Sequence, residues 1–184
     1  MDMTPRELIE ADWNRLREIS GQTPLPYTWK NAFSPRFASV YIMRRAQGAC
    51  MANRHRIAKC WSLINFLVFN AEIPTTAIVG PGFVMPHPQG VILGAGVIGS
   101  NVTVLQQVTF GAKTLDFRFD PTQRPAVEDG VLVSAGAKII GSVRLGQNCI
   151  VGANAVVVSD IPAKALAVGV PARVVEKDGV VEEA

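Results

Sequence analysis

The chain has 184 residues, of which 48% are hydrophobic and 18% are charged, and its formal net charge is +3. These values suit one compact domain with an apolar core. The best candidate for an apolar span, 61–69, contains Asn65 and is far below the roughly 20 residues that a membrane span needs. The charges within 1–20 argue against a cleavable signal. The three cysteines, Cys50, Cys60 and Cys149, have no framework spacing, so we expect a reducing, cytoplasmic setting.

Three helices are predicted in the first 71 residues. A capping box with proline at the first helical position, 4–7, starts a helix that should run to Ser20. After a loop at 21–33, Ser34-Pro35 predicts the start of a second helix. A third helix is expected over about 53–69, with an apolar stripe whose aromatic residues should serve in packing.

The stretch from Ile19 to Ala71 has seven basic residues and no acidic one. One interpretation is a surface that associates weakly with an anionic membrane or substrate. The more common one is a solvated face of two helices. No nucleic-acid motif accompanies these charges, so no nucleic-acid partner is expected. The basic residues are Lys30, Arg36, Arg44, Arg45, Arg54, Arg56 and Lys59.

A six-residue apolar repeat follows, from Glu72 to Val175. Neither a helical period nor a plain alternation explains it. A hexapeptide period is typical of a solenoid in which three short strands make one coil and stacked coils share a core. The first residue of each hexapeptide should point inward. These residues are Ile73, Val79, Met85, Ile92, Ile98, Val104, Phe110, Val127, Val133, Ile139, Leu145, Val151 and Val157.

The repeat is interrupted twice. One extra residue lies near His87, and a longer excursion occupies 111–126, where a long loop in a regular fold is usually functional or disordered. We therefore divide the chain into a helical region at 1–71, a repeat domain at 72–175 with an inserted loop at 111–126, and a frayed tail at 176–184.

Several strings in the repeat carry a family resemblance. They read AEIP at 71–74, VGPGFVMPHPQG at 79–90, VTVLQQVTFGA at 102–112, GVLVSAGAKIIGSV at 130–143, and VGANAVVVSDIP with AVGVPARVV within 151–175. They resemble hexapeptide-repeat acyltransferases, and within these the serine O-acetyltransferases. The resemblance implies a left-handed parallel β-helix, here preceded by the small α-helical region, and acetyl-CoA as co-substrate. We also expect a homotrimer, because one chain alone would leave coenzyme A half exposed in an open groove.

The same resemblance implies a catalytic pair. His87 aligns with the catalytic histidine of the family, and an imidazole suits removal of a hydroxyl proton followed by reprotonation of a thiolate. Glu72 stands where the family has an aspartate that orients this histidine. Without the resemblance, His87 would read as a structural histidine and Glu72 as an exposed carboxylate at a helix-to-coil junction.

A coenzyme A groove is implied along small residues of the repeat. Direct acetyl transfer from coenzyme A needs neither a metal nor an acyl-enzyme nucleophile, and the sequence shows no candidate for either. Cys149 falls on an inward position and reads as a core residue. The cofactor-binding residues that the family positions imply are Gly111, Ala112, Ala135, Ala153, Lys164 and Arg173.

The acceptor positions depart from the family pattern. Pro86 replaces the aspartate before the catalytic histidine, and Arg124 replaces a histidine of the interrupting loop. We therefore expect a small sugar or sugar-derived acceptor, contacted by Gln89, Gln123 and Arg124, rather than L-serine. An ammonium group left unpaired would be costly to desolvate.

Two alternatives remain open, and a third is excluded. The chain could be a genuine serine O-acetyltransferase of cysteine biosynthesis. It could be a trimeric solenoid that serves as an interaction platform without enzyme activity. A γ-type carbonic anhydrase shares the fold but needs three histidines on zinc, and the repeat holds only His87.

Overall fold

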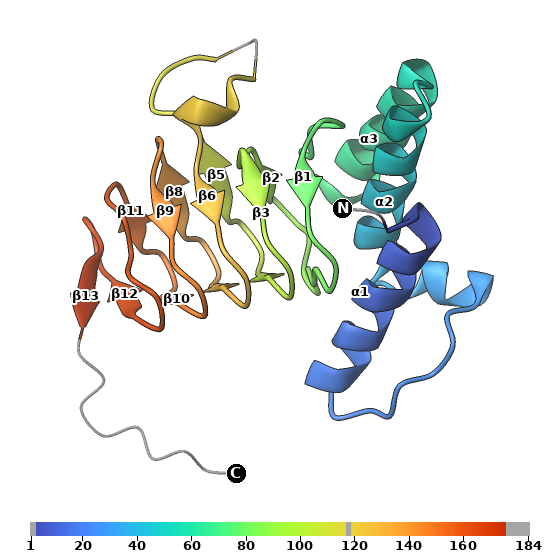
Figure 1. Cartoon of the computed structure of the whole chain (residues 1–184), viewed down its shortest axis with the longest axis horizontal. Helices are drawn as coiled ribbons and strands as arrows, with labels where there is room; N and C mark the ends of the chain where they lie inside the picture. The colour runs from blue at the N-terminus through green and yellow to red at the C-terminus, as the bar shows by residue number, and fades with distance from the viewer. Residues whose placement is uncertain (1–2, 117–118, 176–184) are drawn as a thin grey trace.

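The computed structural model describes residues 3–116 and 119–175; the predicted tail, 176–184, lies outside the described residues. Helices gather at one end of a stack of short strands (Figure 1). They are α1 (Pro5–Ile19), the short 3₁₀ helix η1 (Trp29–Phe33), α2 (Ala38–Met51) and α3 (His55–Phe69). The capping box at Thr4 and Glu7 is confirmed. The second helix starts later than predicted, because a turn over 35–37 precedes it.

The strands form three sheets that the chain visits in turn. Face 1 contains β1 (Ile78–Val79), β3 (Val97–Ile98), β6 (Ala126–Val127) and β9 (Arg144–Leu145). Face 2 contains β4 (Thr103–Val104), β7 (Leu132–Val133), β10 (Ile150–Val151) and β12 (Leu166–Val168). Face 3 contains β2 (Ile92–Leu93), β5 (Thr109–Gly111), β8 (Lys138–Ile140) and β11 (Val156–Val157). All neighbours within these sets pair in parallel.

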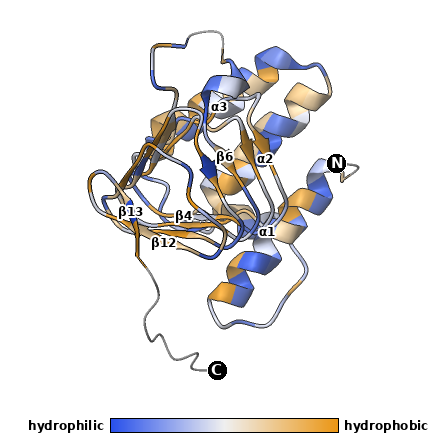
Figure 2. Cartoon of the chain, turned by 60° about the vertical axis from the view of Figure 1, so that its left-hand side comes forward, coloured by the Kyte–Doolittle hydropathy of each residue, from blue (hydrophilic) through white to orange (hydrophobic). Residues whose placement is uncertain are grey.

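Stacked apolar side chains fill the space between the three faces. Val104, Phe110, Val133 and Leu145 are fully buried, as the repeat predicts. The strand segments are accordingly among the hydrophobic parts of the chain in Figure 2. At the far end, β13 (Arg173–Val175) adds to face 2 in the antiparallel sense, which ends the parallel stacking.

One predicted inward position is wrong. Ile92 is 39% exposed, and Leu93 and Val91 are buried instead. Side chains alternate across a strand, so the two residues of β2 must face opposite ways. The irregular corner around His87 is longer than one hexapeptide allows, and it shifts the register of β2 accordingly.

Sharp corners join the faces, and we name them by the faces they connect. Corner 2/3 includes residues 86–90, 105–108, 134–137 and 152–155 on successive coils. At Gly136 the backbone has φ +74°, and an added Cβ would collide with the Asn154 side chain of the next coil. Glycine is needed there for its backbone conformation and for the close stacking of corners.

The helical region is fixed to the first coil by a buried ion pair. Asp12 on α1 and Arg44 on α2 are both fully buried, with Nε of Arg44 2.7 Å from Oδ2 of Asp12. Arg44 also donates to the backbone carbonyls of Val79 and Gly80, at 2.7 and 2.5 Å. The Phe83 amide donates to the other oxygen of Asp12 at 2.8 Å. One cluster therefore joins α1, α2 and the start of the solenoid.

The predicted apolar stripe of α3 does not pack as expected. Only Ala58 and Asn65 of this helix are buried. Large apolar side chains such as Phe66 and Leu67 are 48% and 71% exposed. The helix contacts α2 mainly through small and polar side chains, including an Asn65 amide that donates to the Ser39 carbonyl.

Candidate active site

The structure places His87 on an exposed corner. It lies at corner 2/3 between Pro86, which is half-buried, and Pro88, which is buried. Two backbone hydrogen bonds hold this corner: the Gly90 amide donates to the Asn70 carbonyl, and the Gln107 amide donates to the Gln89 carbonyl, both at 3.0 Å. The imidazole is therefore presented to solvent from a fixed backbone.

Glu72 enters face 3 directly beside this corner. Its amide donates to the Val91 carbonyl and its carbonyl accepts from the Leu93 amide, both at 2.9 Å. Val91 follows His87 by four residues, so the two predicted catalytic residues come from adjacent rungs. Both side chains are exposed, and the described part of the chain shows no hydrogen bond between them. Catalytic hydrogen bonds are often long without substrate and tighten when it binds.

Two of the predicted cofactor residues share the corner of His87. Corner 2/3 is a ladder in which the Gly136 amide donates to the Gln106 carbonyl, and the Asn154 amide to the Ala135 carbonyl, both at 2.9 Å. Ala135 and Ala153 therefore stand on the same edge of the solenoid as His87 and Gln89. Such an edge of small residues can accept an extended ligand close to the backbone.

The other predicted cofactor residues lie elsewhere. Gly111 ends β5, and Ala112 begins the inserted loop at corner 3/1, the corner that joins faces 3 and 1. Lys164 lies at corner 1/2, where its amide donates to the Gln147 carbonyl at 2.8 Å, and Arg173 lies in β13. Within one chain, the structure thus does not bring Lys164 and Arg173 to the edge that carries Ala135 and Ala153.

The inserted loop folds back along corner 3/1. Its short helix η2 (Pro121–Gln123) ends next to Arg124. The Arg124 guanidinium lies 2.9 Å from the Asp116 carboxylate, donates to the Gly94 carbonyl at 3.0 Å and covers the Phe119 ring at 4.1 Å. Its side chain is 11% exposed. Arg124 therefore fixes the loop to the solenoid, whereas Gln123 and Gln89 are exposed.

A pocket beside Glu72 could not be predicted from the sequence. It has a volume of about 440 Å³ and lies between α3, corner 3/1 and the inserted loop. The residues that the sequence analysis missed come from segments far apart in the chain, which no local pattern connects. The unusual length of the inserted loop was the one signal that pointed to this place. Its lining residues are Lys59, Ser62, Leu63, Phe66, Glu72, Pro74, Thr75, Thr76 and Phe119.

Cys149 plays no part in this site. It is fully buried in the solenoid, and burial raises the pKa of its thiol to about 11, with the charge of Glu128 adding to the effect. A protonated, inaccessible thiol is a poor nucleophile. The described residues also contain no group of three or more histidine, cysteine, aspartate or glutamate side chains that could hold a metal.

The fold defines a class: a parallel solenoid of hexapeptide repeats with a helical region at its first coil. Residues 125–159 match the family model for the bacterial transferase hexapeptide, which covers six repeats. The chain is 35% identical over 142 residues to the serine acetyltransferase of Bacillus licheniformis, which is 77% of this chain and 64% of that relative. It is 37% identical to the enzyme of Haemophilus influenzae, covering 61% of this chain and 41% of the relative.

Solved structures agree with these sequences. A serine acetyltransferase in complex with CoA has a TM-score of 0.76 and 28% identity, over 91% of this chain and 68% of that one. The Neisseria gonorrhoeae serine acetyltransferase in complex with serine has a TM-score of 0.77 and 28% identity, over 94% and 69%. The resemblance to the serine acetyltransferase branch of hexapeptide-repeat acyltransferases is therefore confirmed. The chain spans less than two thirds of the length of the two curated relatives.

Proposed function

We propose that the chain is an acetyl-CoA-dependent O-acetyltransferase of the serine acetyltransferase type, built on a left-handed parallel β-helix. The observation that carries this proposal is the common edge at corner 2/3, where His87 stands in line with Ala135 and Ala153. The relatives named above support both the activity and the hand of the helix. Acetyl-CoA would lie along this edge with its thioester toward His87.

In this mechanism His87 acts as general base. It accepts the proton of the acceptor hydroxyl as the oxygen attacks the acetyl carbonyl carbon. The carbon–sulfur bond then breaks, and the imidazolium returns the proton to the thiolate of coenzyme A. Glu72 holds the second ring nitrogen and stabilises the imidazolium. Gly111 and Ala112, with Lys164 and Arg173, are retained as proposed cofactor contacts that a neighbouring chain would complete.

L-serine is the acceptor that the relatives favour, in preference to the sugar predicted from the sequence. Arg124 is occupied by Asp116 and Gly94, so it does not offer a free guanidinium to the acceptor carboxylate. Lys59 is exposed, forms no ion pair with any described residue, and lines the pocket beside Glu72. We assign it the carboxylate of the acceptor, and Glu72 or a neighbouring chain the ammonium.

A sugar-derived acceptor remains the second candidate. It is favoured by Pro86, which leaves no carboxylate next to His87, and by the exposed amides of Gln89 and Gln123. A thiol-release assay with acetyl-CoA would separate the candidates. L-serine is expected to have a specificity constant at least about tenfold above any sugar or sugar phosphate in the panel. The reverse order would establish the sugar reading, and no thiol release with any acceptor would favour a non-enzymatic platform.

We also propose a homotrimer. Ile78 and Val97 are register partners on face 1, and they are 56% and 42% exposed. Paired apolar side chains on a sheet surface are typical of an interface. Analytical ultracentrifugation is expected to give a trimer, and an active monomer would contradict it.

The proposed membrane association of the basic helices has less support. Arg44 is buried and paired with Asp12, so it cannot contribute its charge to a basic surface formed by the other basic side chains. Among the described residues, no helix is long and apolar enough to cross a membrane.

A further inference from the structure

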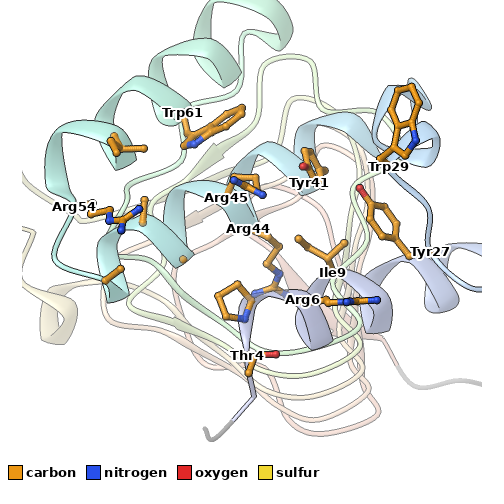
Figure 3. A pocket seen from close by; sticks show the side chains of 15 residues that line it. Thr4, Arg6, Ile9, Tyr27, Trp29, Tyr41, Arg44, Arg45, Arg54 and Trp61 are labelled. Carbon is orange, nitrogen blue, oxygen red and sulfur yellow. The ribbon is translucent and has the colours of Figure 1, made fainter.

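A second pocket lies within the helical region, and none of its lining residues belongs to the proposed active site. Its volume is about 640 Å³, inside the range of roughly 300–1,000 Å³ that is typical of small-molecule sites. All of its lining residues come from 4–61. Figure 3 shows Arg45 at its centre, with Tyr41 and Trp61 nearby and Tyr27 across from Arg54.

Aromatic rings form much of the wall. The rings of Tyr27 and Tyr41 are stacked, with centroids 6.0 Å apart and an interplanar angle of 21°. The Arg45 guanidinium lies 5.6 Å from the centroid of the Trp61 ring. Ile9 and Ile57 add aliphatic surface. Flat rings and aliphatic groups favour a ligand with a flat apolar body.

The charge of the pocket is one-sided. None of its described lining residues is acidic. Arg6 is paired with Glu10 and Arg44 with Asp12, whereas Arg45 and Arg54 are exposed and form no ion pair with any described residue. Two unpaired guanidinium groups at a concave surface favour an anion, because they can offer paired hydrogen bonds to a carboxylate or phosphate.

A neutral donor completes the chemistry. The hydroxyl of Tyr27 is buried beside Tyr41 and forms no hydrogen bond of ordinary geometry with any described residue. Burial raises the pKa of Tyr27 to about 12, and neighbouring Tyr41 adds to this, so the hydroxyl is protonated at neutral pH. A buried polar group without a partner is costly, and a ligand oxygen would satisfy it.

We propose that this pocket is a binding site for a small organic anion with a flat aromatic body, its carboxylate or phosphate held by Arg45 and Arg54. The site is distinct from the one proposed for acetyl transfer. Because α1, α2 and α3 all contribute to its wall, a bound ligand would hold the helical region together and raise its thermal midpoint.

Calorimetric titration of the full chain with phenyl phosphate tests the site. Inorganic phosphate provides the anion alone, and phenol provides the ring alone. Saturable binding of one phenyl phosphate per chain is expected, because it joins the ring and the anion in one ligand. It should be at least about tenfold tighter than either fragment, which corresponds to about 1.4 kcal/mol. Benzoate is titrated in the same way. Whichever of benzoate and phenyl phosphate binds more tightly shows whether the site prefers a carboxylate or a phosphate.

Matched variants locate the site. Arg45→Gln with Arg54→Gln should weaken phenyl phosphate binding by at least about tenfold, whereas Arg36→Gln, an exposed arginine outside the pocket, should leave it unchanged. Circular dichroism checks the fold of each variant. Equal binding of phenol and phenyl phosphate, equal losses in the two variants, or no saturable binding by the wild-type chain would overturn the proposal. Acetyl transfer, measured in parallel, is expected to survive in both variants, so either proposal can fail alone.

Discussion

At the residue scale, the mechanism that we propose depends on one imidazole. His87 is exposed on a corner fixed by hydrogen bonds from Gly90 and to Gln89, and Glu72 stands on the adjacent rung. Two prolines flank the histidine, and proline restricts both its own backbone and that of the residue before it. The corner can therefore present a base without sacrificing rigidity.

Replacing His87 with alanine should lower kcat by about 10²- to 10⁴-fold, the usual value of a general base. The thermal midpoint should stay within a few degrees of wild type, because the side chain is exposed. His55→Ala is the matched control, since it removes the other histidine from an exposed position on α3. Steady-state kinetics with acetyl-CoA would measure both, and a tenth or more of wild-type activity in His87→Ala would remove the assigned role.

The assignment of Lys59 predicts a different kinetic signature. Lys59→Gln should raise KM for L-serine by about tenfold and leave KM for acetyl-CoA unchanged, because a lost ion contact is worth about 1.5 kcal/mol. Lys30→Gln removes an exposed lysine outside that pocket and should change neither value. An unchanged KM for L-serine in Lys59→Gln would place the acceptor carboxylate elsewhere.

Cys149 gives a pH-dependent prediction. Its thiol has a pKa of about 11 in the folded chain, raised by burial from the ordinary 9.0. The unfolded chain therefore loses this proton first as the pH rises, so the stability contribution falls between pH 9 and 11 and is unaffected below that window. Titration with a thiol reagent at pH 8 should label Cys50 and Cys60, and Cys149 only after denaturation. Rapid labelling of all three thiols in the folded chain would contradict the buried position.

The sequence indicated the residue types of the site better than their contacts. His87 and Glu72 stood out because the family resemblance aligned them. The roles of Arg124 and Lys59 could not be predicted in the same way. Arg124 lies eight residues from Asp116 in a loop without periodicity, and Lys59 lines the same pocket as Glu72 only because α3 lies beside the first coil.

At the scale of elements, the helical region and the solenoid behave as joined parts. The joint is the cluster of Asp12, Arg44 and the carbonyls of Val79 and Gly80. Burial raises the pKa of Asp12, and Arg44 and the Phe83 amide oppose that rise. The partners are 32 residues apart and come from different helices, so the sequence offered no pattern that would pair them.

Removing one partner of this pair should be strongly destabilising. Arg44→Met leaves the Asp12 carboxylate buried without its counter-charge, which should lower the free energy of unfolding by about 3–5 kcal/mol. The double variant Asp12→Leu with Arg44→Met should recover much of the loss, because no isolated charge remains. Urea unfolding of both variants would test this. A loss below about 1 kcal/mol in Arg44→Met would show that the pair contributes no more than an exposed one.

Regular elements were predictable where the repeat was regular. Strands β7 to β11 follow the hexapeptide spacing, and their inward residues are buried as predicted. The prediction was wrong at Ile92, because the corner at His87 breaks the period. It was also wrong for α3, whose apolar stripe predicts a packing face, because most of that stripe is exposed. Periodicity identifies an apolar face, but it does not say which surface covers that face.

At the scale of the whole molecule, the chain is a parallel solenoid on which we propose two distinct sites. One edge carries His87 and the alanines of successive corners, and the helical end carries the aromatic, basic pocket. The exposed apolar pair on face 1, Ile78 and Val97, agrees with the proposal that further copies pack alongside. The resemblance to serine acetyltransferases connects this architecture to acetyl transfer.

The most direct test is the product formed from acetyl-CoA and L-serine. Mass spectrometry of the reaction mixture should show O-acetyl-L-serine accumulating in step with free coenzyme A, and neither product above background with His87→Ala. If an acetylated sugar forms and acetylserine does not, the acceptor is a sugar and not L-serine. No acetylated product from L-serine or any other hydroxyl acceptor would contradict the central claim that this solenoid is an acetyltransferase.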